Sequence, residues 1–152
     1  MFNFLTTITQ DLHPMVVHFP IALFFLSFIL AVVGLKRSPY QDMEWSLFAI
    51  GTIISPVAVV TGLIAHSPYE ETQFASVIEP HQFSAIVGTV VLIVFAIWRF
   101  MSRRRDKDIG RQSWYRWVAL IGLIWIIFVG GTGGQLVYEY GLNVRGVNPL
   151  LP

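Results

Sequence analysis

Four histidines are the residues of this sequence best suited to chemistry. The segment "HPMVVHFP" at 13–20 places His13 and His18 at the start of a strongly apolar stretch, while His66 ends a second such stretch and His81 begins a third. An imidazole can ligate a metal ion or a haem iron, or it can carry a proton. In apolar surroundings the ring needs a partner for at least one nitrogen. Each histidine therefore predicts either a functional site or a hydrogen-bonded structural contact.

Four apolar runs carry these histidines, at about 14–35, 45–66, 80–100 and 117–138. Each run has close to the ~20 residues that cross a membrane as a helix, and a helix satisfies its own backbone hydrogen bonds in lipid. With 55% hydrophobic and 12% charged residues, the composition is that of a membrane protein and not of a soluble domain. We therefore predict one all-α domain over residues 1–152, an integral membrane four-helix bundle with up-down-up-down topology.

Basic residues are distributed unevenly between the two sides of the predicted bundle. Nine of the ten lie on one side, in or beside the loops at 36–44 and 101–116, and only Arg145 lies on the other. The positive-inside rule places both basic loops in the cytoplasm. We therefore predict a multi-pass protein of the inner (plasma) membrane with both termini on the periplasmic or extracellular side. A basic loop of this kind anchors topology and does not predict nucleic-acid binding. Arg99, near the end of the third run, is expected to extend its side chain to the membrane surface.

This topology gathers all four histidines at the outer side of the membrane. Pro14 and Pro80 suit a first helical turn, which puts His13 and His81 at helix mouths. His18 then lies about 7 Å deeper in the membrane. Because the first and third spans of such a bundle lie diagonally across its core, His18 and His81 are the natural pair to bridge it.

Small residues beside the histidines predict space for a flat cofactor; they include Gly62, Gly88, Gly130 and Gly134. Small residues also let membrane helices pack closely, but a macrocycle held between helices needs clearance around its axial ligands. The leading hypothesis is a protein with one haem b, or two, in which His18 and His81 ligate the iron. His66 and His13 would form a second ligand pair, bind the propionates or cap their helices. Such ligation favours an electron carrier or subunit over a stand-alone enzyme, with an outward-facing redox protein or a quinone as partner.

Two other classes of function stay open. A zinc or copper site would use the four histidines together with Glu70, Glu71 or Glu79. A cofactor-free subunit would use the histidines for hydrogen bonds between helices, within a larger membrane complex or a homo-oligomer. The sequence has no cysteine, which excludes c-type haem attachment and thiolate ligation of iron–sulfur clusters.

Two motifs make the chain similar to a known family. The segments "LHPMVVHFPIAL" at 12–23 and "GGQLVYEYGLNV" at 133–144 resemble the opening and closing motifs of the bacterial membrane proteins called domain of unknown function 2231. The resemblance spans nearly the whole chain and implies four spans, with a glycine at Gly62 in the second and a histidine at His81 in the third. Relatives often carry a further histidine where this chain has Tyr140, which argues against a site that uses this position. The resemblance also implies an association with respiratory and electron-transfer components.

Overall fold

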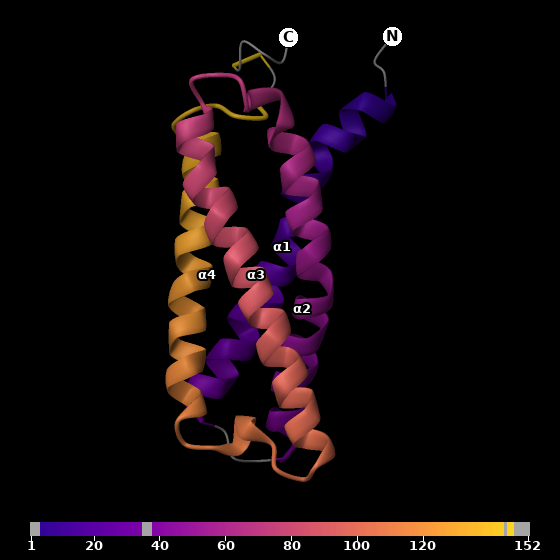
Figure 1. Ribbon diagram of the computed structural model, residues 1–152, viewed down its shortest axis with the longest axis vertical. Helices are drawn as coiled ribbons and strands as arrows, with labels where there is room; N and C mark the ends of the chain where they lie inside the picture. The colour runs from indigo at the N-terminus through magenta and orange to yellow at the C-terminus, as the bar shows by residue number, and fades with distance from the viewer. Residues whose placement is uncertain (1–3, 35–37, 145, 148–152) are drawn as a thin grey trace.

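The computed structural model of the protein describes residues 4–34, 38–144 and 146–147, and in it four long helices run side by side (Figure 1). The helices are α1 (Phe4–Val33), α2 (Ser38–His66), α3 (Ala75–Arg104) and α4 (Tyr115–Tyr138). Two short 3-10 turns, η1 (Ser67–Tyr69) and η2 (Ile109–Arg111), lie in the connections before α3 and α4. The described ranges contain no strand, which confirms the all-α prediction.

Each of the four helices is long and apolar enough to cross a membrane, over Leu12–Val33, Pro39–Tyr69, Ala75–Arg104 and Tyr115–Tyr138. Large apolar side chains cover the outward faces of the bundle, such as Ile53 (74% exposed), Phe83 (70%) and Ile121 (68%). An apolar surface of this extent is unfavourable in water and is matched by lipid hydrocarbon. The fold is therefore that of a multi-pass membrane protein.

The bundle has two chemically different ends. α1 begins and α4 ends at the same end, where η1 joins α2 to α3, and η2 lies at the opposite end (Figure 1). We name the first the histidine end, after His13, His66 and His81, and the second the basic end, after Arg99 and Arg103. Three basic residues that contribute to the predicted orientation lie outside the described residues: Lys36, Arg37 and Arg145.

The helices are longer than the predicted spans. α1 begins at Phe4 and α3 at Ala75, so Pro14 and Pro80 lie inside helices and not at their first residues. A proline inside a helix removes one backbone hydrogen bond and bends the helix. The first turns of α1 accordingly lean away from the bundle (Figure 1). The histidines next to these prolines thus lie within helices and not at helix mouths.

At the basic end, the side chain of Arg99 is 1% exposed. Its guanidinium donates hydrogen bonds to both carboxylate oxygens of Glu44, at 2.8 and 2.5 Å, and its Nε donates to Asp108 at 3.2 Å. The rings of Trp45 and Tyr115 lie 5.1 and 4.6 Å from the guanidinium carbon. The prediction that Arg99 extends to the membrane surface is wrong, because two carboxylates hold the charge inside the bundle.

Glu44 accepts further hydrogen bonds that complete this Arg99 network. The Tyr115 hydroxyl donates to Glu44 Oε1 at 2.8 Å and accepts from Arg99 at 2.5 Å, and Ser27 Oγ donates to the same carboxylate oxygen at 3.1 Å. A Cβ at Gly110 would lie 2.2 Å from the guanidinium, so glycine gives the arginine its space. Ser27, Glu44, Arg99 and Tyr115 come from α1, α2, α3 and α4 respectively. One network of buried charges and hydroxyls therefore joins all four helices.

An apolar core separates the Arg99 network from the histidine end. Phe24 and Phe28 of α1 stack with ring centres 5.8 Å apart, and Phe48 of α2 lies 5.8 and 6.2 Å from them. Leu92 and Ile126 contribute from α3 and α4. The described core is thus a plug of large side chains between the two polar ends.

The segment after α4 packs against η1 at the histidine end. Gly141 has a φ of +63°, in the left-handed region that glycine adopts without strain. The N–H of Gly141 bonds to the carbonyl of Val137 at 3.0 Å, as in an αL cap, and the N–H of Leu142 bonds to the carbonyl of Leu136 at 3.1 Å. Leu142 packs on Tyr69, whose hydroxyl donates to Asn143 Oδ1 at 3.2 Å. This turn explains the final glycine of the closing motif.

We expect Glu44→Gln to lower the free energy of unfolding by about 3 kcal/mol or more, because it leaves a buried guanidinium short of one carboxylate. Asp42→Asn is the matched control, since Asp42 is 56% exposed in its ion pair with Arg103 and should cost less than about 1 kcal/mol. Denaturant unfolding in detergent micelles measures both variants. Equal losses would contradict the role given to the Arg99 network.

Asp108 lies between two spans, and its pKa makes the stability that the Arg99 network provides depend on pH. Burial alone would raise the pKa of Asp108, but the charge of Arg99, the N–H of Gly110 and the charge of Arg103 together lower it from its ordinary value. A carboxyl group with a lowered pKa adds stability above its unfolded pKa of about 4, and this stability is lost as pH falls through the folded pKa. We expect the free energy of unfolding of the wild type to decrease as the pH is lowered below about 4. In Asp108→Asn this decrease should be smaller. An unchanged acid dependence of unfolding in the variant would count against this assignment.

Candidate functional site

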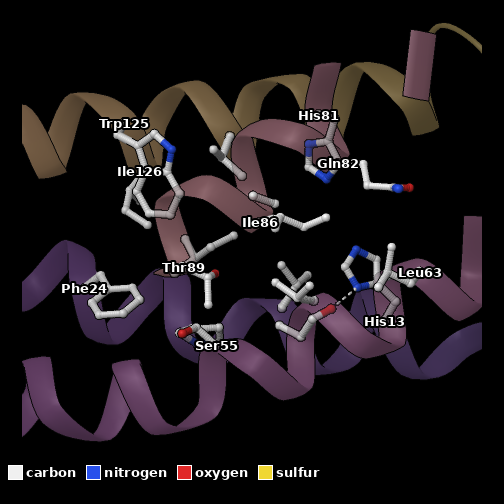
Figure 2. A pocket seen from close by; sticks show the side chains of 18 of the residues that line it. His13, Phe24, Ser55, Leu63, His81, Gln82, Ile86, Thr89, Trp125 and Ile126 are labelled. Carbon is white, nitrogen blue, oxygen red and sulfur yellow. Dashed lines mark hydrogen bonds between the residues drawn. The ribbon is translucent and has the colours of Figure 1, made fainter. Parts of the chain in front are cut away.

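A small cavity lies inside the bundle near the histidine end (Figure 2). It has a volume of about 70 Å³, and all four helices contribute to its wall. Apolar side chains such as Phe24, Ile86 and Trp125 form most of this wall. Its polar lining residues are His13, Ser55, His66, His81, Gln82 and Thr89.

Three imidazoles from three different helices meet at this cavity. His13 belongs to α1, His66 ends α2 and His81 belongs to α3. The ring centres of His13 and His66 are 5.9 Å apart, and those of His66 and His81 are 6.1 Å apart. Figure 2 shows the rings of His13 and His81 facing each other across the cavity. We call these residues the histidine cluster.

Hydrogen bonds fix which ring nitrogen carries the proton in two of these residues. Nδ1 of His13 lies 3.0 Å from the carbonyl oxygen of Ala58, which can only accept. Nδ1 of His81 lies 3.0 Å from Oγ1 of Thr132, and this hydroxyl donates its own proton to the carbonyl of Val129 at 3.0 Å. The hydroxyl therefore accepts from His81. In their neutral forms, His13 and His81 thus carry the proton on Nδ1 and keep a lone pair on Nε2.

His66 differs from its two neighbours because its Nδ1 is buried and has no hydrogen-bond partner among the described residues. The residue is 6% exposed, and its side chain is hydrogen-bonded to Gln82. A buried polar atom without a partner costs about 1–3 kcal/mol, and such atoms are rare in folded proteins. The Nδ1 of His66 is therefore an exception to polar pairing among the described residues.

Two glycines give the imidazoles their positions. A Cβ at Gly62 would lie 3.0 Å from Cε1 of His13, and a Cβ at Gly133 would lie 3.0 Å from Cε1 of His81. Both distances are tighter than ordinary van der Waals contact. Gly62, predicted to border a cofactor, thus borders an imidazole.

Of the other three predicted glycines, Gly88 has its space filled by a side chain. The indole of Trp125 occupies the space beside Gly88, where a Cβ would lie 1.9 Å from the ring. A Cβ at Gly130 would meet no described atom outside the helix backbone within 4 Å, and a Cβ at Gly134 would meet only Tyr138 of the same helix, at 4.0 Å. Helix packing thus explains Gly88, while the structure gives no contact that explains Gly130 or Gly134.

His18 does not reach the cavity. Its ring is exposed, and its Nδ1 bonds to the carbonyl of Pro14 one turn earlier on the same helix. A separation of five residues rotates two side chains by roughly 140°, so His13 and His18 cannot both face the bundle. His13 faces inward because it shares a stripe with the buried Phe24. The predicted pairing of His18 with His81 is therefore corrected: His13 and His66 meet His81 instead.

The cavity is far smaller than a haem requires. Pockets for drug-sized ligands hold roughly 300–1,000 Å³, and an engineered apolar cavity of about 150 Å³ binds benzene. A groove of about 430 Å³ between α3 and α4 is larger, but none of the described residues that line it is a histidine. Neither the cavity nor this groove therefore fits a haem b ligated by two histidines between the helices, which is the cofactor that the sequence pattern favours.

Imidazole nitrogens are common metal ligands, but the rings of the histidine cluster are too far apart to share one ion. Metal–nitrogen bonds of about 2.1 Å at tetrahedral angles place imidazole centres roughly 5 Å apart. The observed separations of 5.9 and 6.1 Å are wider. Accordingly, no group of three His, Cys, Asp or Glu side chains among the described residues is arranged to hold a metal ion.

The chain belongs to the family described as "Predicted membrane protein (DUF2231)", which it matches over residues 9–146. This match confirms the family resemblance drawn from the two motifs. None of the curated proteins and none of the solved structures matches the chain. The family description names no activity, so a functional proposal rests on the cavity.

We expect His66→Leu to raise the free energy of unfolding of the metal-free protein by about 1 kcal/mol or more, because it removes a buried polar atom without a partner. His81→Leu is the control. It deletes the hydrogen bond to Thr132 and should lower the free energy of unfolding by a similar amount. Denaturant unfolding in micelles with a chelator measures both variants. Destabilisation by His66→Leu would show that the hydrogen bond of this side chain to Gln82 contributes more than the unpaired nitrogen costs.

Proposed function

We propose that this protein is a membrane-embedded binding protein for a zinc or copper ion, held by His13, His66 and His81. The main support for this proposal is Nδ1 of His66. This nitrogen is buried, and its lone pair or proton has no hydrogen-bond partner among the described residues. Imidazole nitrogen is a preferred ligand of zinc and copper. A bound ion would provide the electron-pair acceptor that this nitrogen lacks.

The hydrogen bonds of the other two imidazoles support the same proposal. A histidine that ligates a metal usually donates its second ring N–H to a carbonyl, a carboxylate or a water, which orients the ring. His13 donates to Ala58 and His81 donates to Thr132, both at 3.0 Å. Each ring therefore already has the outer partner of a metal ligand, and its Nε2 is left to bind.

The size of the cavity selects the kind of ligand. A space of about 70 Å³ admits an ion with one or two waters and is too small for a cofactor with rings. Towards the basic end, Phe24 and Ile126 of the apolar core close the cavity. This closure supports binding with exchange at the histidine end and argues against transport across the membrane. With the basic loops in the cytoplasm, as the positive-inside rule predicts, the ion would exchange with the outer side.

We expect the purified wild-type protein to bind one zinc ion per chain, and His66→Gln or His81→Gln to weaken binding more than about 100-fold. Loss of a ligand should exceed the 10- to 100-fold effect of losing a ligand's outer partner. His18→Gln is the matched control. His18 lies in the same opening motif as His13, but it is exposed and does not line the cavity. Elemental analysis after dialysis and competition with a zinc-sensitive dye give the stoichiometry and the dissociation constant.

A second variant separates ligation from a general loss of structure. Thr132→Val removes the acceptor of the His81 N–H without removing an imidazole, and should weaken zinc binding about 10- to 100-fold. A wild type that binds no zinc or copper would overturn the proposal. Equal loss of binding in His18→Gln and His66→Gln would overturn it as well.

A further inference from the structure

We infer that a polar vestibule at the histidine end is the entrance through which the metal ion reaches the histidine cluster, and that Glu70 and Glu79 attract it; this rests on the proposed function. The vestibule has a volume of about 290 Å³ and lies between η1 and the first turns of α3. Its lining residues are His66, Tyr69, Glu70, Ala75, Ile78, Glu79 and Gln82.

The vestibule and the cavity share part of their walls. His66 and Gln82 line both spaces, so one imidazole borders the vestibule on one side and the cavity on the other. His66 is also the residue whose Nδ1 has no partner among the described residues. An ion that leaves the vestibule would therefore meet this ring first. His13 and His81, with ring centres 5.9 and 6.1 Å from that of His66, would complete its binding.

The charges of the vestibule favour cations. Glu70 and Glu79 are exposed, and neither forms a salt bridge with a described residue. The described lysines and arginines lie at the opposite end of the bundle, from Arg99 to Arg116. Two unpaired carboxylates at the mouth of a recess raise the local concentration of cations and speed their association. The carboxylates lie on the path and outside the histidine cluster, so they act on the rate of loading.

The test is the rate at which the full-length protein in micelles takes up cobalt, a visible-absorbing substitute for zinc. At low ionic strength, the Glu70→Gln/Glu79→Gln double variant should load about three- to tenfold more slowly than wild type in stopped-flow absorbance. Its final absorbance at saturating cobalt should equal that of wild type. Because salt screens exposed charges, the difference should shrink in 1 M salt.

Glu71→Gln is the matched control. Glu71 is the exposed neighbour of Glu70 and does not line the vestibule, so its variant should load at the wild-type rate. Equal rates in the double variant and wild type, or equal slowing by Glu71→Gln, would overturn the entrance while leaving the proposed function intact. A wild type that takes up no cobalt would overturn both.

Discussion

One buried guanidinium constrains the whole bundle. Arginine stays charged at any pH that a protein meets, and a buried charge that lacks its partner costs several kcal/mol. Arg99 is therefore stable inside the bundle only if the surrounding helices bring acceptors to it. Glu44 supplies both carboxylate oxygens, and Ser27 and Tyr115 hold that carboxylate from two further helices. Satisfying this one charge fixes which face each helix turns inward at the basic end.

The same constraint reaches the histidine end through helical periodicity. Arg99 and His81 are 18 residues apart on α3, which is about five full turns, so a helix that turns one inward also turns the other inward. Close matches hold on two other helices, between Ser27 and His13 on α1 and between Glu44 and His66 on α2. By contrast, His18 lies nine residues before Ser27, about two and a half turns, and so faces outward. A fully paired network at one end thus positions a cluster with an unpaired nitrogen at the other. Local rules of polar pairing are commonly violated at functional sites, with stability supplied elsewhere.

Hydropathy predicts the four helices and the common end of the histidines well, because helix length and apolar composition are local properties. Which imidazoles converge is not local. Depth in the membrane favours His18 as the inward-facing ligand. The rotation of the side chains about the helix axis favours His13 instead, because His13 shares the inward stripe of Phe24. The burial of Arg99 cannot be predicted from its own span, because its main partner, Glu44, is 55 residues away in the sequence. The roles of Thr132 and Gly133, in the run "GGTGGQ", depend on the contact between α3 and α4, which no pattern within one helix reveals.

The bundle therefore combines a charge-paired end with an end where three imidazoles border a cavity of about 70 Å³. X-ray absorption at the zinc edge of the metal-loaded protein tests this view most directly. We predict three imidazole nitrogens at about 2.0–2.1 Å from the metal, with one imidazole fewer in His66→Gln and no change in His18→Gln. A spectrum of oxygen ligands alone, or one that His66→Gln leaves unaltered, would contradict it.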